Sequence, residues 1–165
     1  MRTTDVITLF DHLYWTRDAI LRAASELDVD AFASTDTVTT RDLRTTLVHE
    51  LDVQWSWRER LRGADWAEWG EDAELKPADY PTAEAVAEHW QRDEVEMRAW
   101  VRSLTDADLG APPPRDEDTL PLWYFVMHLI SHGMQQFSEA AVLLTNAGHS
   151  PGDIGFLEFV GSKEV

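Results

Sequence analysis

Apolar residues recur at the spacing of an α-helix in four long segments of the chain. The segments cover approximately residues 4–27, 40–63, 83–104 and 120–147. In the second segment, Leu43, Leu47 and Leu51 form an i, i+4 stripe. Gly148 follows the fourth segment and can end a helix in a left-handed conformation. No segment sustains the alternation of a β-strand, so the pattern predicts an all-α protein.

The connections between these segments predict how the helices are joined. Residues 62–82, "RGADWAEWGEDAELKPADYPT", are rich in Gly, Pro and Asp and form a long link between the second and third helices. Pro112, Pro113 and Pro114 interrupt the next link. We therefore predict one domain over residues 1–165, a four-helix bundle with a long crossover between its second and third helices. Residues 151–165 are expected to be an irregular C-terminal tail.

The composition of the chain indicates where the protein is located and which classes of partner it binds. Hydrophobic residues make up 44% of the chain, enough for a packed core, and no apolar run reaches the ~20 residues of a membrane helix. The first residues lack the apolar core of a signal peptide. We expect a cytoplasmic protein that does not bind a membrane. The net charge of −17, from 31 acidic and 14 basic residues, disfavours nucleic acid and is compatible with a high-salt habitat.

The absence of cysteine limits the possible chemistry. Thiolate metal sites and cysteine nucleophiles are excluded, so a metal ion would need imidazole, carboxylate or amide ligands. His128 and His132 are i, i+4 neighbours, and Gln136 continues the same helical face. His49 lies in the middle of the second segment. A lone helical histidine such as His49 is more often a hydrogen-bonded core residue than a ligand.

The polar face of the fourth segment also has a structural interpretation. His132 and Gln136 can hydrogen-bond each other, or a water molecule, in a polar cavity. A glutamine carbonyl is a poor ligand for zinc or nickel compared with imidazole. No residue stands out as a general base or nucleophile, so the catalytic residues stay unknown. Trp55, Trp57 and Trp123 can line a substrate cleft.

Two stretches together resemble the DinB-like (YfiT-type) metalloenzyme family. These are "LVHELDVQWSW" in the second segment and "WYFVMHLISHGMQQFSEAAVLLTNAGHSPGD" in the fourth. The resemblance covers nearly the whole chain and implies the bundle and crossover expected above. In relatives the fourth helix typically carries a small polar residue, His, Gly, two variable residues, His and then Arg. His132 matches the first of these histidines, whereas Gln136 replaces the second and Phe137 replaces the arginine.

The resemblance implies a metal site formed by the second and fourth helices. His49 matches the family's ligand in the second helix, so the site is reduced to His49, His132 and Gln136. An alternative is a site shifted by one helical turn, in which His128 and His132 join His49. Glu50 or Asp52 can orient an imidazole of such a site. The metal would be a divalent ion, with zinc or nickel favoured.

The family's chemistry suggests two functions for this chain. In one, it is a metal-dependent enzyme with thiol transferase-like activity, acting on a small-molecule substrate and a low-molecular-weight thiol. In the other, the loss of the third histidine leaves a metal-free binding or scaffold protein with the same bundle. Family members commonly form homodimers, and the resemblance implies the same here.

Overall fold

The computed structural model describes residues 1–65, 69–70, 73–114 and 119–163. The four predicted long helices are present as α1 (Thr3–Ala24), α3 (Leu43–Leu61), α4 (Ala83–Ser103) and α6 (Leu122–Asn146). Shorter elements are α2 (Val29–Phe32), the 3₁₀-helix η2 (Pro77–Asp79), α5 (Asp106–Gly110) and α7 (Phe156–Ser162). The described residues contain no strand. The all-α prediction is confirmed.

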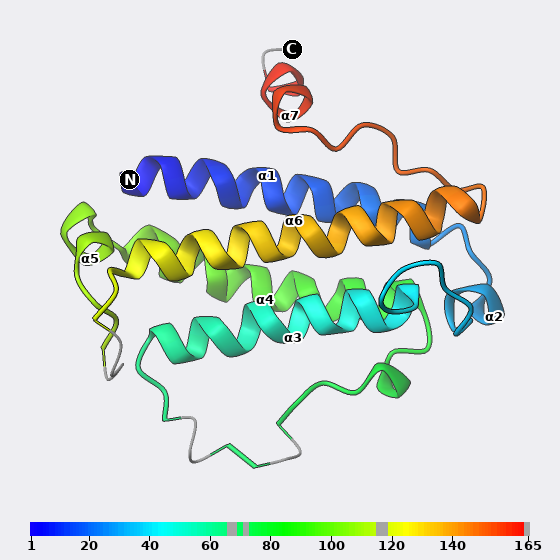
Figure 1. The fold of residues 1–165 in the computed structure, drawn as a ribbon, viewed down its shortest axis with the longest axis horizontal. Helices are drawn as coiled ribbons and strands as arrows, with labels where there is room; N and C mark the ends of the chain where they lie inside the picture. The colour runs from blue at the N-terminus through cyan, green and yellow to red at the C-terminus, as the bar shows by residue number, and fades with distance from the viewer. Residues whose placement is uncertain (66–68, 71–72, 115–118, 164–165) are drawn as a thin grey trace.

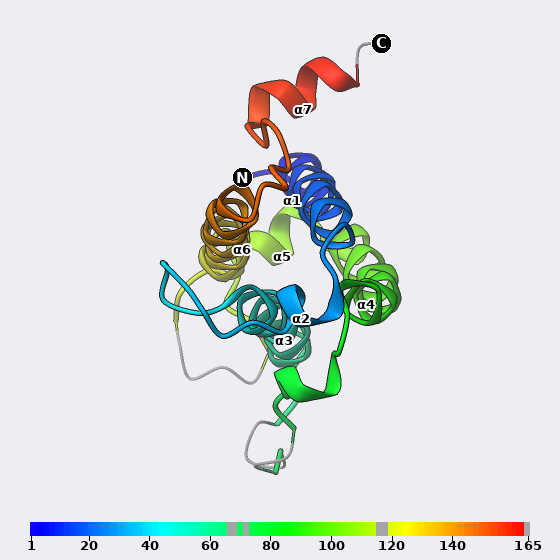
Figure 2. The same cartoon turned by 90° about the vertical axis from the view of Figure 1, so that its right-hand side faces the viewer.

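The four long helices form a bundle with a non-simple order (Figures 1 and 2). α1 packs between α4 and α6, and α3 packs between the same two helices on the opposite side. α1 and α6 run in one direction, whereas α3 and α4 run in the other (Figure 1). Because α3 and α4 are parallel, the chain must return along the bundle before α4 begins. This arrangement confirms the long crossover predicted between the second and third helices.

Local capping explains where the long helices begin and end. The Asp42 side chain accepts a hydrogen bond from Thr45 N–H, so α3 starts slightly later than its apolar pattern indicates. Thr82 caps α4 by accepting from Ala85 N–H. Gly148 has φ +87° just after α6, as predicted for a left-handed helix stop.

The C-terminal tail differs from the sequence-based prediction of an irregular segment over residues 151–165. Residues 151–155 are irregular as expected, but α7 follows them and packs on α1. Phe159 of α7 is buried against the rings of His12 and Trp15, and His12 Nε2 bonds the carbonyl of Ile154 at 3.0 Å. The short apolar run after residue 153 is helical because α1 offers it an aromatic surface. No helix among the described residues has the length and apolarity needed to cross a bilayer.

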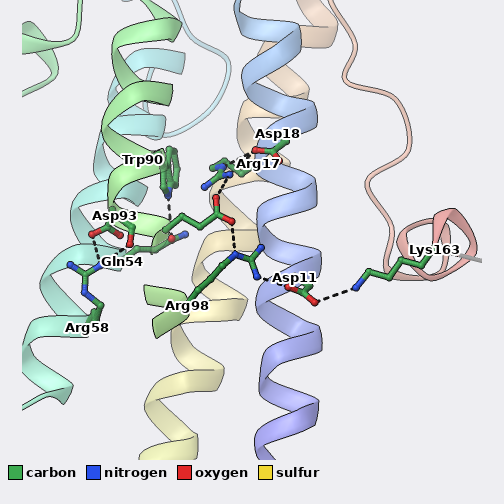
Figure 3. A network of polar contacts seen from close by, with 10 residues as sticks. Asp11, Arg17, Asp18, Gln54, Arg58, Trp90, Asp93, Arg98 and Lys163 are labelled. Carbon is green, nitrogen blue, oxygen red and sulfur yellow. Dashed lines mark hydrogen bonds and ion pairs between the residues drawn. The ribbon is translucent and has the colours of Figure 1, made fainter. Parts of the chain in front are cut away.

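A network of charged side chains joins α1 to α4 (Figure 3). Arg98 of α4 contacts Asp11 of α1 and Glu94 of its own helix. Arg17 of α1 contacts Glu94, and Lys163 beyond α7 contacts Asp11. Each of these carboxylates therefore meets at least one cation, which links α7 and α4 to the same face of α1.

Candidate metal site between α3 and α6

Two histidines meet at the seam between α3 and α6. His49 lies in α3 and His132 in α6, and the two helices run antiparallel. The centroids of the two rings are 5.3 Å apart, with 64° between the ring planes. The His132 side chain keeps 19% of its surface exposed, and His49 is half-buried. The two histidines expected to share a site thus lie together, where solvent can reach them.

A buried carboxylate holds the His132 ring. His132 Nδ1 lies 2.6 Å from Glu50 Oε2, and Glu50 is completely buried. The other oxygen of Glu50 accepts a 2.7 Å hydrogen bond from Gln54 Nε2. Gln54 Oε1 accepts one in turn from Trp90 Nε1 at 3.2 Å. Because an indole N–H can only donate, Trp90 fixes the Gln54 amide so that its NH₂ group points to Glu50.

This chain of hydrogen bonds sets the tautomer of His132. An ionised Glu50 accepts the Nδ1–H of His132 and leaves Nε2 unprotonated. Burial raises the pKa of Glu50, while the hydrogen bonds from His132 and Gln54 oppose that shift. Carboxylate–histidine pairs of this kind orient the imidazoles of many metal sites. With Glu50 ionised, Nε2 of His132 is free to act as a ligand.

Gly133 makes room for this carboxylate. A Cβ atom at position 133 would lie 2.6 Å from Glu50 Oε1 and 2.8 Å from Leu13 Cδ1. A glycine inside a helix costs roughly 0.5–1 kcal/mol relative to alanine. Gly133 has no positive φ that would call for glycine. The close approach of Glu50 and Leu13 therefore explains it.

Two buried polar atoms lie on one side of the histidine pair. Gln136 is 3% exposed and Thr46 is fully buried. Neither Gln136 Oε1 nor Thr46 Oγ1 has a hydrogen-bond partner in the described part of the chain. Gln136 follows His132 by one helical turn and Thr46 precedes His49 by one, so in antiparallel helices both lie at the same level. A buried amide oxygen without a partner is a candidate ligand for a cation.

His128 lies beside the pair but outside the buried seam. Its side chain is exposed, and its ring centroid is 5.8 Å from that of His132. Partial burial lowers the pKa of His128, and the neighbouring His132 lowers it further. His128 also contacts Trp57, with ring centroids 5.3 Å apart. The structure thus places His128 one turn along the same face, as its spacing predicts.

The surroundings of His49 lower its pKa and so favour its neutral form. Burial is the largest cause that lowers the pKa of His49, followed by the charges of Arg41 and His132. Glu74 acts in the opposite direction but more weakly. A neutral imidazole is the form that binds a metal ion, because protons otherwise compete for the nitrogen lone pair.

The seam offers two imidazoles and an amide oxygen, which are donor types that a divalent metal ion accepts. Among the described residues, no three His, Cys, Asp or Glu side chains form a metal-binding group. The oxygens of Glu50 already bond His132 and Gln54. The candidate ligands are therefore the imidazoles of His49 and His132 with the amide oxygen of Gln136. Zinc and nickel accept such ligands, and the neutral amide predicts weaker binding than a third imidazole would give.

Sequence reasoning named the histidine pair and one of the residues that support it. Glu50 was expected to orient an imidazole, and it bonds His132 across the seam. Asp52, the other candidate, accepts the backbone N–H of Leu75 instead. Of the two structural alternatives for His132 and Gln136, a mutual hydrogen bond is not among the described contacts, and His132 Nδ1 bonds Glu50. The roles of Gly133, Gln54 and Trp90 were missed.

The sequence signals for these supporting residues were weak but present. Glu50, Gln54 and Arg58 recur at i, i+4 and i+8 and are all buried. A polar stripe at that spacing in a helix with apolar residues on both sides indicates buried partners on the facing helices. A glycine directly after His132, inside a helix, likewise indicates a close approach by a neighbouring group.

The helices and the site lie within a region that matches a known protein family. The family model described as the DinB family matches residues 1–163, which include every helix named above. No curated protein matches the chain.

Proposed function

The chain belongs to the DinB family, and we propose that it is a cytoplasmic metal-dependent enzyme with a reduced histidine site. His49 and His132 would hold one divalent ion, zinc or nickel, with Gln136 as the weaker third ligand. The substrate would be a small molecule, and the chemistry would be transfer to or from a low-molecular-weight thiol.

The observation that carries this proposal is the bond between His132 and the fully buried Glu50. Taking an ionised carboxylate out of water costs several kcal/mol, and no guanidinium or ammonium group bonds Glu50 among the described contacts. A structural role would be served equally by an uncharged residue. A role in orienting a ligand and increasing its basicity needs the charge.

Each residue of the site would have a definite task. When bound, the metal ion would lower the pKa of a thiol or of water and so supply a nucleophile. Glu50 keeps the proton of His132 on Nδ1, so that Nε2 stays free. Gln54 and Trp90 hold the Glu50 carboxylate in place, and the partial exposure of His132 leaves a path for the substrate.

Metal analysis of untagged protein, purified without chelator, tests this function. We expect about one zinc or nickel ion per chain, lost in the variant His49→Ala. The variant His149→Ala is the matched control, because His149 bonds Glu26 away from the seam. Metal-free protein, or equal metal contents in the His49→Ala and His149→Ala variants, would contradict the proposal.

The presence of Gln136 at the third ligand position favours a second candidate function. In this alternative, the protein keeps the bundle but binds no metal and acts as a homodimeric binding or scaffold protein. Its polar seam would then accept an uncharged ligand or water at Gln136 Oε1, for which the described residues supply no hydrogen-bond partner. A chelator would leave its thermal stability unchanged, whereas it would lower the melting temperature of a protein isolated with its metal.

A further inference from the structure

A continuous series of contacts leads from α1 to the histidine pair. The guanidinium carbon of Arg17, in α1, lies 5.8 Å from the ring centroid of Trp90 in α4. Trp90 donates a hydrogen bond to Gln54 in α3. Gln54 donates one to Glu50, which bonds His132 in α6. Figure 3 shows Arg17 extending from α1 toward Trp90, whose ring meets Gln54. The charge network between α1 and α4 therefore contacts the residues that support the candidate metal site.

The Trp90 ring is held by contacts from three helices. It is 0% exposed, and its centroid lies 5.6 Å from that of Phe137 in α6. Its Nε1 lies 3.2 Å from Gln54 Oε1, and Arg17 is the charged group described over the ring. An indole has a single N–H group, so the direction of its hydrogen bond depends on how the ring is held. The contact with Arg17 therefore helps to fix the orientation of the Gln54 amide.

Arg17 is itself fixed by two carboxylates and two rings. Its side chain is 4% exposed, and Nη2 lies 2.5 Å from Glu94 Oε2 and 2.7 Å from Asp18 Oδ1. The other terminal nitrogen, Nη1, is buried and has no hydrogen-bond partner among the described residues. The guanidinium lies over the rings of Tyr14, at 4.7 Å, and Trp90, at 5.8 Å. A cation is attracted to the face of an aromatic ring, so Arg17 stabilises the position of Trp90.

We propose that Arg17 is a positioning residue for the metal ligand His132, acting through the ring of Trp90. The proposal rests on the proposed function, because it concerns a ligand of the same site. Arg17 keeps the indole N–H directed at Gln54 Oε1, and this keeps the Gln54 NH₂ group on Glu50. A less fixed Trp90 would let the amide turn over and face Glu50 with its oxygen. That oxygen would repel the carboxylate and weaken its hold on the Nδ1–H of His132.

Arg98 provides a matched control for Arg17. Both arginines pair with Glu94, and both lie over the Tyr14 ring, at 4.7 Å for Arg17 and 4.9 Å for Arg98. Among the described ring contacts, Arg17 approaches Trp90 and Arg98 does not. The variants Arg17→Met and Arg98→Met therefore remove similar ion pairs from the same seam. A purely structural role predicts the same consequences for both, whereas the positioning role predicts a change at Trp90 and His132 in Arg17→Met alone.

Imidazole nitrogen NMR on metal-free, untagged, full-length protein tests the proposal. We expect Arg17→Met to increase the fraction of His132 rings with the proton on Nε2, and Arg98→Met to leave it at the parent value. Hydrogen exchange at the Trp90 indole N–H should be faster in Arg17→Met. Arg17→Lys keeps a charge for the carboxylates but loses the planar group over the ring, so it should fold and show the same changes in part. Parent-like His132 signals in every folded Arg17 variant, or an equal change in Arg98→Met, overturn the proposal.

Zinc titration connects the positioning role to the metal. Arg17→Met should weaken zinc binding by about threefold, the loss expected when one contact between a cation and a ring is removed. Arg98→Met should bind zinc like the parent. Equal zinc affinities in the Arg17→Met and Arg98→Met variants contradict the positioning role. A parent that binds no zinc overturns the proposed function, and the NMR comparison on metal-free protein then decides the role of Arg17 separately.

Discussion

The carboxylates of the α1–α4 seam and of the α3–α6 seam lie in opposite electrostatic environments. They are half-buried beside cations in the first seam, and the one in the second is fully buried beside an imidazole and an amide. Between α1 and α4, Arg98 hydrogen-bonds Asp11 and Glu94 (Figure 3). Burial alone would raise the pKa of both acids, but the nearby cations outweigh it and lower each pKa below its ordinary value. Between α3 and α6, Glu50 meets an imidazole and an amide, and burial raises its pKa.

This difference separates structural from functional polarity. Paired charges in the first seam hold two helices together and favour the ionised form of the carboxylates. In the second seam, no cation bonds Glu50 among the described contacts. Both seams contain buried polar atoms without a described hydrogen-bond partner, such as Gln136 Oε1 in the second and Tyr14 Oη in the first. A buried carboxylate without a cation lowers the stability of the fold, and proteins retain one mostly at sites with a chemical role. The comparison therefore singles out Glu50 and the histidine that it bonds.

The largest stability effect is expected at Gly133. In the variant Gly133→Ala, the added Cβ would overlap Glu50 Oε1 and Leu13 Cδ1 and destabilise the fold by about 2–3 kcal/mol. Urea unfolding followed by circular dichroism measures the loss. Gly161→Ala in α7 is the matched control, since a Cβ there has no atom within 4 Å and should be neutral or slightly stabilising. Equal stability of the Gly133→Ala and Gly161→Ala variants would show that Glu50 can move aside freely.

Removing the Arg98 cation from the α1–α4 seam should cause the next largest loss of stability. Arg98→Met leaves Asp11 and Glu94 with fewer partners and should destabilise the protein by about 1–2 kcal/mol at neutral pH. Arg92→Met is a suitable control, because Arg92 is an exposed residue of the same helix. Unfolding titrations of both variants measure the difference.

The pH dependence of this loss follows from the direction of the shifts. A carboxyl whose pKa is lowered by folding stabilises the protein above its unfolded-state pKa, and that stability is lost as the pH falls through its folded-state pKa. The pKa values of Asp11 and Glu94 are lowered. The gap between the parent and Arg98→Met should therefore be full at pH 7 and close below roughly pH 4. A gap that stays constant on acidification would contradict the ionic interpretation.

The smallest predicted change in stability is a gain, in the variant Glu50→Gln. Glu50→Gln removes the buried charge and keeps hydrogen-bonding groups for His132 and Gln54, so the fold should become more stable by about 1 kcal/mol. The same change should weaken metal binding by about 10–100-fold, because an amide NH₂ donating to His132 Nδ1 places the remaining proton on Nε2. Thermal unfolding and zinc titration are measured on the same samples. A destabilised Glu50→Gln variant with unchanged zinc affinity would assign Glu50 a purely structural role.

Local signals in the sequence predict much of the fold. Helix spacing and the stop at Gly148 place the long helices to within a few residues, because helix breakers act on the neighbouring backbone. The caps Asp42 and Thr82, found in the structure, set the exact starts of α3 and α4. The helix α7 was missed because its stability comes from contact with His12 and Trp15, far away in the chain.

Local sequence patterns predict less of the candidate site than of the fold. The pairing of His49 with His132 depends on the register between α3 and α6, which no local pattern contains; the family resemblance supplied it. Glu50 follows His49 directly, and a step of ~100° around the helix turns it toward His132. That direction becomes visible only when both helices are placed. Gly133 is informative only once the Glu50 carboxylate is known to lie against it.

A double-mutant cycle on zinc affinity tests the shared site most directly. Zinc is titrated into the untagged parent, His49→Ala, His132→Ala and the double variant, after metal removal. If both imidazoles bind the same ion, the parent takes up one equivalent, and each single variant loses most of the affinity that the double variant loses. Losses that simply add, or a parent that binds no zinc, would contradict a metal site between α3 and α6.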